Sequence, residues 1–247
     1  LGEHVTLLNT LALETAGITK SSELPGCEMV RDTVSGEPTG LIKGMYIEEI
    51  LARVIPALTR RQKKKAILTA VKELNSLGIT SITEGALGPG AQGFHYGLWD
   101  EECIDIYREL ASTGELSLRV GIMLLLVPYG SYSQEIYRHL AHLKLEPNAG
   151  DESVRIAGIK LFADGIPINK TAWMHQEYTG GGNGRLVFPG ENDEERSGEL
   201  AKVIEHCQRL GLRVGIHATG DRASDACIDG IIKAQRKSPK RLRHYII

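Results

Sequence analysis

Segments with a helical pattern and segments with a strand-like pattern alternate along most of this chain, and this alternation restricts its fold more than any other feature. Apolar residues at helical spacing run up to Gly78, and a β-rich segment at residues 79–84 follows directly. We expect further helices at residues 103–111, 133–143, 194–210 and 223–235, and further strands at residues 118–127, 154–162, 212–217 and 243–247. Such alternation implies parallel strands joined by right-handed crossovers. A (β/α) barrel and a doubly wound open sheet both satisfy this pattern.

Polar residues at the carboxyl ends of the predicted strands favour the barrel. Glu84, Lys160 and His217 stand at these ends, and Asp164 and Asp221 follow the last two within four residues. The carboxyl ends of barrel strands converge on one face, which is where functional groups meet. We therefore predict an α/β fold that is a partial (β/α)8 TIM barrel, comprising about strands 2 to 6 of the eight.

The beginning of the chain lacks this alternation. A short helix is expected within residues 7–16, whereas residues 30–44 have a turn signal at 35–38 and an otherwise irregular pattern. Such a segment is short for a stable core of its own. We predict that residues 1–55 are an insertion segment packed on the barrel, and that residues 56–247 form the incomplete barrel.

Composition limits the possible partners. The net charge of the 247-residue chain is −2, and its one basic tract, residues 60–65, opens a predicted helix, so a solvated helix face explains it better than nucleic-acid binding. No apolar stretch is long enough to cross a membrane, and no signal-peptide pattern opens the chain. The four scattered cysteines lack a CxxC pair, which predicts reduced thiols and a cytoplasmic protein.

The sequences at both ends of the chain predict that it continues in a longer protein. The first residue is Leu1, and residues 243–247 have the pattern of a buried strand that needs neighbours on both edges. We expect a fragment of a longer protein, whose exposed sheet edges would pair either with another copy, in a homo-oligomer, or with the missing segments.

Two apolar runs that each end in a polar cluster carry the clearest chemical signal. Because strand side chains alternate between faces, Gly158 shares a face with Lys160 and Gly215 shares one with His217. Each of these polar side chains then has open space beside it, which suits a metal site in a barrel mouth. The plainer alternatives are a lysine stem lying over apolar surface and a hydrogen-bonded histidine.

Several segments together resemble one known family. They are residues 3–4, 8–13 and 16–18, Arg31-Asp32, residues 36–40 and 77–81, the run from Lys160 to Gly165, Thr171-Ala172, and the run from His217 to Ala223. In this combination the chain resembles the amidohydrolase superfamily, specifically the amidohydrolase 3 branch, which includes N-substituted formamide deformylase-like and exoenzyme-regulator-like proteins. The resemblance extends over nearly the whole chain.

The resemblance implies a (β/α)8 barrel with one or two divalent metal ions, commonly zinc, at its mouth. Lys160 is similar to the family's fourth-strand lysine, which is carbamylated where it bridges two metals, and His217 is similar to the fifth-strand histidine ligand. The family's first-strand His-x-His pair would lie before Leu1, its sixth-strand histidine directly after Ile247, and its eighth-strand catalytic aspartate further on. The chain therefore supplies two of the three or four ligands usual for zinc, and the fragment need not hold metal by itself.

Five other residues have weaker claims to the site. Asp164, Asp221 and Arg222 either orient the ligands or cap turns and helices. Glu84 either reaches the mouth from the second strand or is an exposed loop carboxylate. His4 is assigned a substrate-proximal position by the resemblance alone. The glycine-rich segment at residues 165–192 is either a lid over the site or a disordered loop.

The function implied by the resemblance is hydrolysis of a non-peptide carbon–nitrogen bond in a small amide, formamide or cyclic amide by metal-activated water. One alternative is a metal-free, barrel-derived binding or regulatory module. Another is a metal-free enzyme in which Lys160 forms a Schiff base with its substrate. The chain has neither a nucleophile-elbow motif nor a phosphate-binding loop motif, which argues against serine hydrolases and nucleotide-binding proteins.

Overall fold

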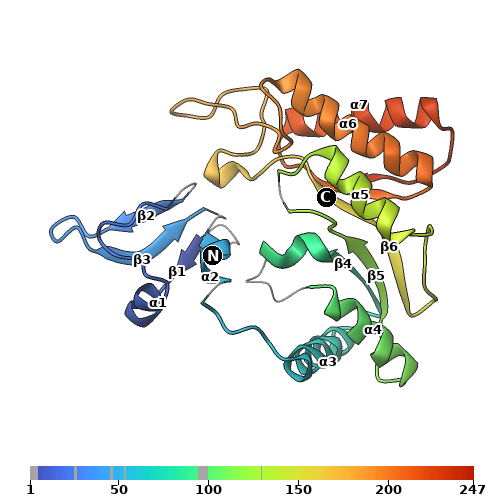
Figure 1. Cartoon of the computed structure of the whole chain (residues 1–247), viewed down its shortest axis with the longest axis horizontal. Coiled ribbons are helices and arrows are strands. Elements are labelled where there is room, and N and C mark those ends of the chain that lie inside the picture. The colour runs from blue at the N-terminus through green and yellow to red at the C-terminus, as the bar shows by residue number, and fades with distance from the viewer. Residues whose placement is uncertain (1–4, 25–26, 45–46, 53, 94–99, 129) are drawn as a thin grey trace. The chain divides into compact units, whose positions relative to one another are not determined.

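The computed structural model of the chain describes residues 5–24, 27–44, 47–52, 54–93, 100–128 and 130–247 (Figure 1). The backbone divides into two compact units. One comprises residues 1–58 with 93–98, and the other comprises residues 59–92 with 99–247.

The described part of the first unit is built on a small antiparallel sheet. Its elements are β1 (Val5–Leu7), α1 (Thr10–Thr15), β2 (Glu28–Arg31), β3 (Pro38–Lys43) and α2 (Ile47–Leu51). The strand order is β1-β3-β2. Ile18, Ile42, Ile47 and Leu51 form a buried cluster within this unit. That residues 1–55 are an insertion packed on a barrel stays a prediction.

The irregular pattern predicted at residues 30–44 was wrong in part, because β2 and β3 form a hairpin there. The predicted turn connects them: the Asp32 carboxylate accepts hydrogen bonds from the backbone N–H groups of Val34 and Ser35, and Gly36 has a φ of 75°. An aspartate that bonds the backbone two and three residues ahead is a local turn device. The strands on either side are mostly half-buried, so their sequence lacks a clear apolar alternation.

The second unit is a parallel sheet with helices between successive strands. Its strands are β4 (Ser81–Leu87), β5 (Arg119–Leu124), β6 (Val154–Phe162), β7 (Val214–His217) and β8 (Tyr245–Ile246). Its helices are α3 (Arg60–Ser76), α4 (Glu102–Ser112), α5 (Ser133–Leu143), α6 (Asp193–Leu210) and α7 (Asp221–Lys237), with short 3-10 turns at η1 (Pro89–Gly93) and η3 (Pro167–Asn169). The strands pair in chain order, β4-β5-β6-β7-β8, and every pair is parallel. The predicted α/β fold with a parallel sheet is confirmed.

One face of this sheet is covered by helices. Apolar residues of that face, among them Ile122, Leu161 and Ile216, form a single buried cluster with residues of α4, α6 and α7. The helices α6 and α7 pack side by side (Figure 1). Burial of this apolar surface is the main force that holds the helices on the sheet.

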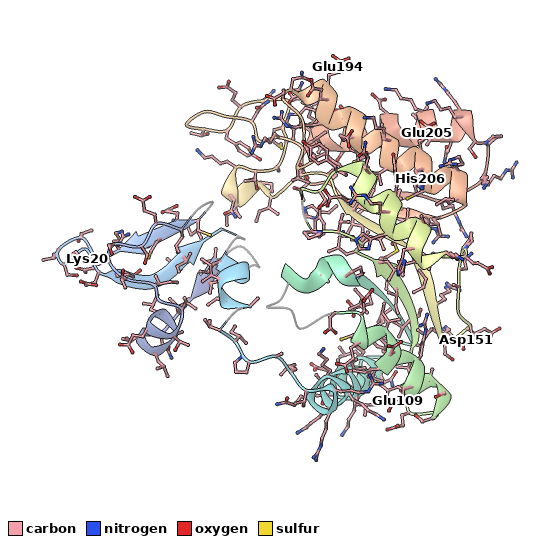
Figure 2. All side chains as sticks on the ribbon, in the orientation of Figure 1. Lys20, Glu109, Asp151, Glu194, Glu205 and His206 are labelled. Atoms are coloured by element: carbon pink, nitrogen blue, oxygen red, sulfur yellow. The ribbon has the colours of Figure 1, made fainter. Side chains whose placement is uncertain are left out.

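Local signals set the ends of the long helices. Thr59 and Gln62 form a capping box at the start of α3, and the Asn192 side chain accepts a hydrogen bond from the backbone N–H of Glu195 at the start of α6. The left-handed Gly211, with a φ of 81°, ends α6. Figure 2 shows Glu194 at the beginning of α6, and Glu205 and His206 near its end. No helix in the described ranges is both long and apolar enough to span a bilayer.

Candidate functional site

The adjacent strands β6 and β7 bring the two predicted metal ligands to the same face. The register pairs Lys160 with Gly215 and Phe162 with His217. Paired residues of neighbouring strands project to the same side, and so do residues two apart on one strand. Lys160, Phe162 and His217 therefore lie together on the side of the sheet opposite Leu161 and Ile216.

The ring of Phe162 lies close to both the Lys160 and the His217 side chains. The Lys160 Nζ lies over the ring, 4.7 Å from its centroid, and the His217 ring centroid is 5.3 Å from the Phe162 centroid. Lys160 is buried, with 6% of its surface exposed, and His217 is half-buried. A cation above an aromatic face is attracted by the ring quadrupole. Phe162 was not among the predicted site residues, although its position two residues after Lys160 in a strand places it on the same face.

The imidazole of His217 is oriented by the segment that follows β6. Its Nε2 is 3.3 Å from the carbonyl oxygen of Gly165, and the Thr219 hydroxyl donates to the same oxygen. Because a carbonyl can only accept, this hydrogen bond requires the proton on Nε2. The lone pair of the neutral ring then lies on Nδ1, which is the nitrogen that can bind a metal.

The space beside the two glycines is filled. A Cβ built on Gly215 would lie 2.9 Å from the Met123 Cε and 2.9 Å from the Tyr245 Cζ, and one on Gly158 would lie 3.1 Å from the same methyl group. The expectation of open space around Lys160 was therefore wrong. Side chains from β5 and β8, far away in the sequence, fill the gap that the glycines leave.

A small cavity borders the Lys160 side chain. Its volume is about 30 Å³, enough for about one water molecule, and Phe162 and the largely apolar segments 125–128 and 187–188 contribute to its walls. The surroundings of the lysine are thus mainly apolar on this side.

Asp164 is fully buried and binds three backbone N–H groups. Its carboxylate accepts from Trp173 at 2.8 Å, from Thr219 at 3.0 Å and from Gly220 at 2.8 Å. These donors belong to the loop after β6 and to the turn after His217. The structure therefore gives Asp164 the task of holding two backbone segments, and both of them border the site.

Asp221 and Arg222 stand in the first turn of α7 and contact the same loop. The Asp221 carboxylate accepts from the backbone N–H of His175 at 2.8 Å, and this bond is the main cause that lowers the pKa of Asp221. The Arg222 guanidinium lies 4.3 Å from the centre of the Trp173 ring and forms an ion pair with Asp193 at 3.2 Å. Both residues fasten the loop to the start of α7.

The long loop after β6 is ordered by these contacts. Ala172, Trp173, Leu186 and Phe188 are buried, and the His175 Nε2 lies 2.7 Å from an Asp225 carboxylate oxygen on α7. These contacts favour an ordered loop over the disordered alternative. That the loop acts as a lid stays a prediction.

Glu84 is directed away from the Lys160 side of the sheet. It pairs with Ile122 on the helix-covered face, and the Tyr107 hydroxyl of α4 donates to its carboxylate at 3.3 Å. Burial, followed by this nearby carboxylate, raises the pKa of Tyr107. This placement gives no support to the predicted site role of Glu84. His4 lies outside the described residues.

Lys160 and His217 provide some, but not all, of the ligands that a metal ion needs. Within the described ranges, no group of three or more His, Cys, Asp or Glu side chains has the geometry of a metal site. Lys160 and His217 supply one amine and one imidazole on a common face. Since zinc usually takes three or four protein ligands, these two residues would form one side of a metal centre.

Comparison with known proteins gives consistent matches. A model of the amidohydrolase family matches residues 1–247. Among curated proteins, the chain is 28% identical over 229 residues to Protein LONG AFTER FAR-RED 3 of Arabidopsis thaliana, covering 92% of this chain and 36% of that protein. It is 25% identical over 243 residues to the putative amidohydrolase YtcJ of Bacillus subtilis (strain 168), covering 98% of this chain and 40% of that protein.

Solved structures agree with these matches. Uncharacterized metal-dependent hydrolases from Pyrococcus horikoshii OT3 and Pyrococcus furiosus each match with a TM-score of 0.64 and 25% identity. The match covers 98% of this chain in both cases, and 42% and 43% of the respective hydrolases. The chain thus spans about two fifths of the length of the relatives and structures that it matches.

Proposed function

This chain belongs to the amidohydrolase family, and from that membership we propose that it is part of a metal-dependent hydrolase that cleaves a non-peptide carbon–nitrogen bond in a small amide-type substrate. The observation that supports the proposal is that Lys160 and His217 lie on one face of the sheet and that both are close to the ring of Phe162.

We propose further that the parallel sheet is a section of a (β/α)8 barrel. Its five strands follow one another in chain order, whereas a doubly wound sheet reverses its strand order at a switch point. In this assignment β4 to β8 are strands 2 to 6 of the barrel. The helix-covered face is then the outside, and the face with Lys160 and His217 is the inside.

The two ligands would hold zinc in different ways. His217 would bind through Nδ1, since its Nε2 faces the Gly165 carbonyl. Lys160 would bind as a carbamate: its neutral amine adds to carbon dioxide, a nitrogen–carbon bond forms, and one proton is released. The two carbamate oxygens share one negative charge and replace an ammonium group that would repel the metal. When bound, a divalent metal polarises a substrate carbonyl and generates hydroxide near neutral pH.

The other residues of the site act on the ligands and the loop. Asp164 holds the turn behind His217, and Asp221 and Arg222 hold the loop after β6 against α7. The mainly apolar surroundings of Lys160 exclude bulk water from one side of the site. The exclusion of water strengthens electrostatic interactions within such a site.

Metal analysis of the complete natural protein tests this proposal. Zinc content would be measured after dialysis, with and without bicarbonate, for the wild type and for Lys160→Ala and His217→Ala. Lys170→Ala, on the exposed part of the loop, is the matched control for the lysine. We expect both site variants to lose metal, and bicarbonate to raise the metal content of the wild type and the control only. Unchanged metal content in both site variants would contradict the proposal.

The bond that is cleaved requires a second measurement. The metal-loaded protein would be assayed with small amides, formamides and cyclic amides, with esters of matched shape as controls, and the released amine would be quantified. Amine release that depends on Lys160 and His217 is the expected result. A protein that binds these compounds without metal and without turnover would instead be a metal-free binding module.

A further inference from the structure

The buried carboxylate of Asp164 binds two backbone segments at once. One oxygen accepts from the N–H of Thr219 at 3.0 Å, and the other accepts from the N–H groups of Trp173 and Gly220, both at 2.8 Å. Trp173 belongs to the loop after β6, and Thr219 and Gly220 form the turn between His217 and α7.

The two segments touch through their backbones at this point. A Cβ on Gly220 would lie 2.0 Å from the Trp173 carbonyl oxygen, so only glycine permits this approach. The same carbonyl accepts from the N–H of Ala223 at 3.2 Å, in the first turn of α7. The loop therefore completes the start of α7, where helix N–H groups lack partners within the helix.

The residue next to Asp164 completes the contact with His217. The Gly165 carbonyl accepts from the Thr219 hydroxyl and from the His217 Nε2 at 3.3 Å. The Asp164 carboxylate thus binds the backbone of the turn, and the carbonyl of the next residue, Gly165, accepts the hydrogen bond from the His217 imidazole. A shift of the turn relative to the end of β6 would break the imidazole hydrogen bond and free the ring to change its tautomer.

We propose that Asp164 is a positioning residue: its carboxylate fixes the turn after His217 against the end of β6, and so sets the Nε2–H tautomer and the direction of Nδ1. The same carboxylate links the base of the loop to this ring. Only the consequence for metal binding rests on the proposed function.

Three backbone N–H donors at position 164 explain why a carboxylate is needed there. An ionised carboxylate only accepts, and three N–H groups point at its two oxygens. In Asp164→Asn one acceptor oxygen becomes an N–H2 donor, so at least one backbone N–H would face another donor inside the protein. A buried donor without an acceptor is strongly unfavourable, and the turn is expected to move to relieve it.

The tautomer of His217 is a direct readout, measured through the nitrogen-15 chemical shifts of its ring in the metal-free protein. The variants are Asp164→Asn and the matched control Asp151→Asn. Asp151 also accepts two backbone N–H groups, from Ser153 at 2.7 Å and Val154 at 2.9 Å, but it is exposed and precedes β6 (Figure 2). We expect a single Nε2–H tautomer in the wild type and the control, and a mixture of tautomers in Asp164→Asn.

A third variant keeps the test decisive if Asp164→Asn does not fold. Thr219→Val removes the hydroxyl that donates to Gly165 but leaves the backbone N–H on Asp164. Under the proposal the Nε2–H tautomer survives in Thr219→Val. Its loss there would assign the positioning to the hydroxyl and overturn the proposal. Retention of the wild-type tautomer in a folded Asp164→Asn would overturn it as well.

Zinc affinity of the complete natural protein provides the second readout. Loss of a group that orients a metal-binding histidine typically lowers metal affinity by about 10- to 100-fold. We expect a loss of that size in Asp164→Asn and none in Asp151→Asn. A wild type that binds no zinc would contradict the proposed function, whereas the tautomer experiment would still decide the role of Asp164.

Discussion

Lowering the pH below neutrality is expected to destabilise the protein through His244, a histidine that the fold keeps uncharged. Its Nδ1 accepts from the backbone N–H of Val214 at 3.0 Å, and its Nε2 lies 2.6 Å from the side-chain oxygen of Gln208. The Gln208 amide nitrogen donates to the carbonyls of Ser238 and Lys240 at 2.6 and 2.9 Å. The Gln208 side chain therefore directs its oxygen at the His244 ring and accepts a hydrogen bond from Nε2–H. A proton added at Nδ1 of His244 would face the backbone N–H of Val214, which is also a donor.

The size of the effect follows from the pKa. Burial, with a smaller contribution from the positive charge of Arg213, lowers the pKa of His244 from 6.5 to about 4. Between these two values the unfolded chain binds one more proton than the folded chain, so the free energy of unfolding falls by about 1.4 kcal/mol per pH unit. The stabilising contribution is complete above pH 6.5 and is lost as the pH falls toward 4. Because the ring is partly exposed, we reduce the full value of roughly 3 kcal/mol to about 2 kcal/mol.

Urea unfolding at a series of pH values between 7 and 4.5 measures this contribution. His244→Gln removes the titrating ring, and His142→Gln, which replaces an exposed histidine of α5, is the matched control. We expect the free energy of unfolding to depend less steeply on pH in His244→Gln than in the wild type, and equally steeply in His142→Gln. If His244→Gln keeps the full wild-type slope between pH 6.5 and 4.5, the ring is not held neutral and the reasoning fails.

Three further outcomes are expected from the packing. Gly220→Ala should destabilise the protein by about 2–4 kcal/mol in urea unfolding, because the added Cβ would lie 2.0 Å from the Trp173 carbonyl oxygen, and an unchanged stability would refute that contact. Gly198→Ala, in the interior of α6 with no atom within 4 Å of the added Cβ, should instead stabilise by about 0.5–1 kcal/mol. The thiols of Cys207 and Cys227 are buried, which raises the pKa of each to about 12, so neither should react with a thiol reagent until the protein unfolds; rapid labelling of the native protein would contradict this.

The sequence was most informative where one element has one dominant signal. The helix expected at residues 133–143 and the strand expected at residues 154–162 coincide with α5 and β6. α5 has an apolar stripe at helical spacing, and β6 is a nearly continuous apolar run of the kind that buried parallel strands have. The antiparallel strands β2 and β3 were missed because half-buried strands on a small sheet lack both signals.

For the candidate site, the sequence indicates which residues share a face with Lys160 and His217, but not what surrounds them. Strand alternation already placed Lys160 beside Gly158 and His217 beside Gly215, since that depends only on neighbours along the chain. That Met123 fills the space beside both glycines depends on the pairing of β5 with β6, a contact between segments far apart in sequence. No local pattern reveals such a contact.

The role of Asp164 shows the same limit. A single aspartate after a strand is compatible with a ligand, a ligand-orienting group or a turn cap. Its three donors lie 9, 55 and 56 residues further along the chain, and only the folded structure brings them together. The side of the sheet on which Glu84 lies was also hidden in the sequence. It depends on the register with Ile122, which places Glu84 on the helix-covered face.

The central claim is that Lys160 and His217 bind one metal centre together. A crystal structure of the complete natural protein grown with zinc and bicarbonate, with anomalous data collected at the zinc edge, tests this claim most directly. The account predicts an anomalous peak about 2 Å from the Nδ1 of His217 and about 2 Å from an oxygen attached to the Nζ of Lys160. An unmodified Lys160 together with a zinc peak away from both side chains, or with no peak at all, would contradict it.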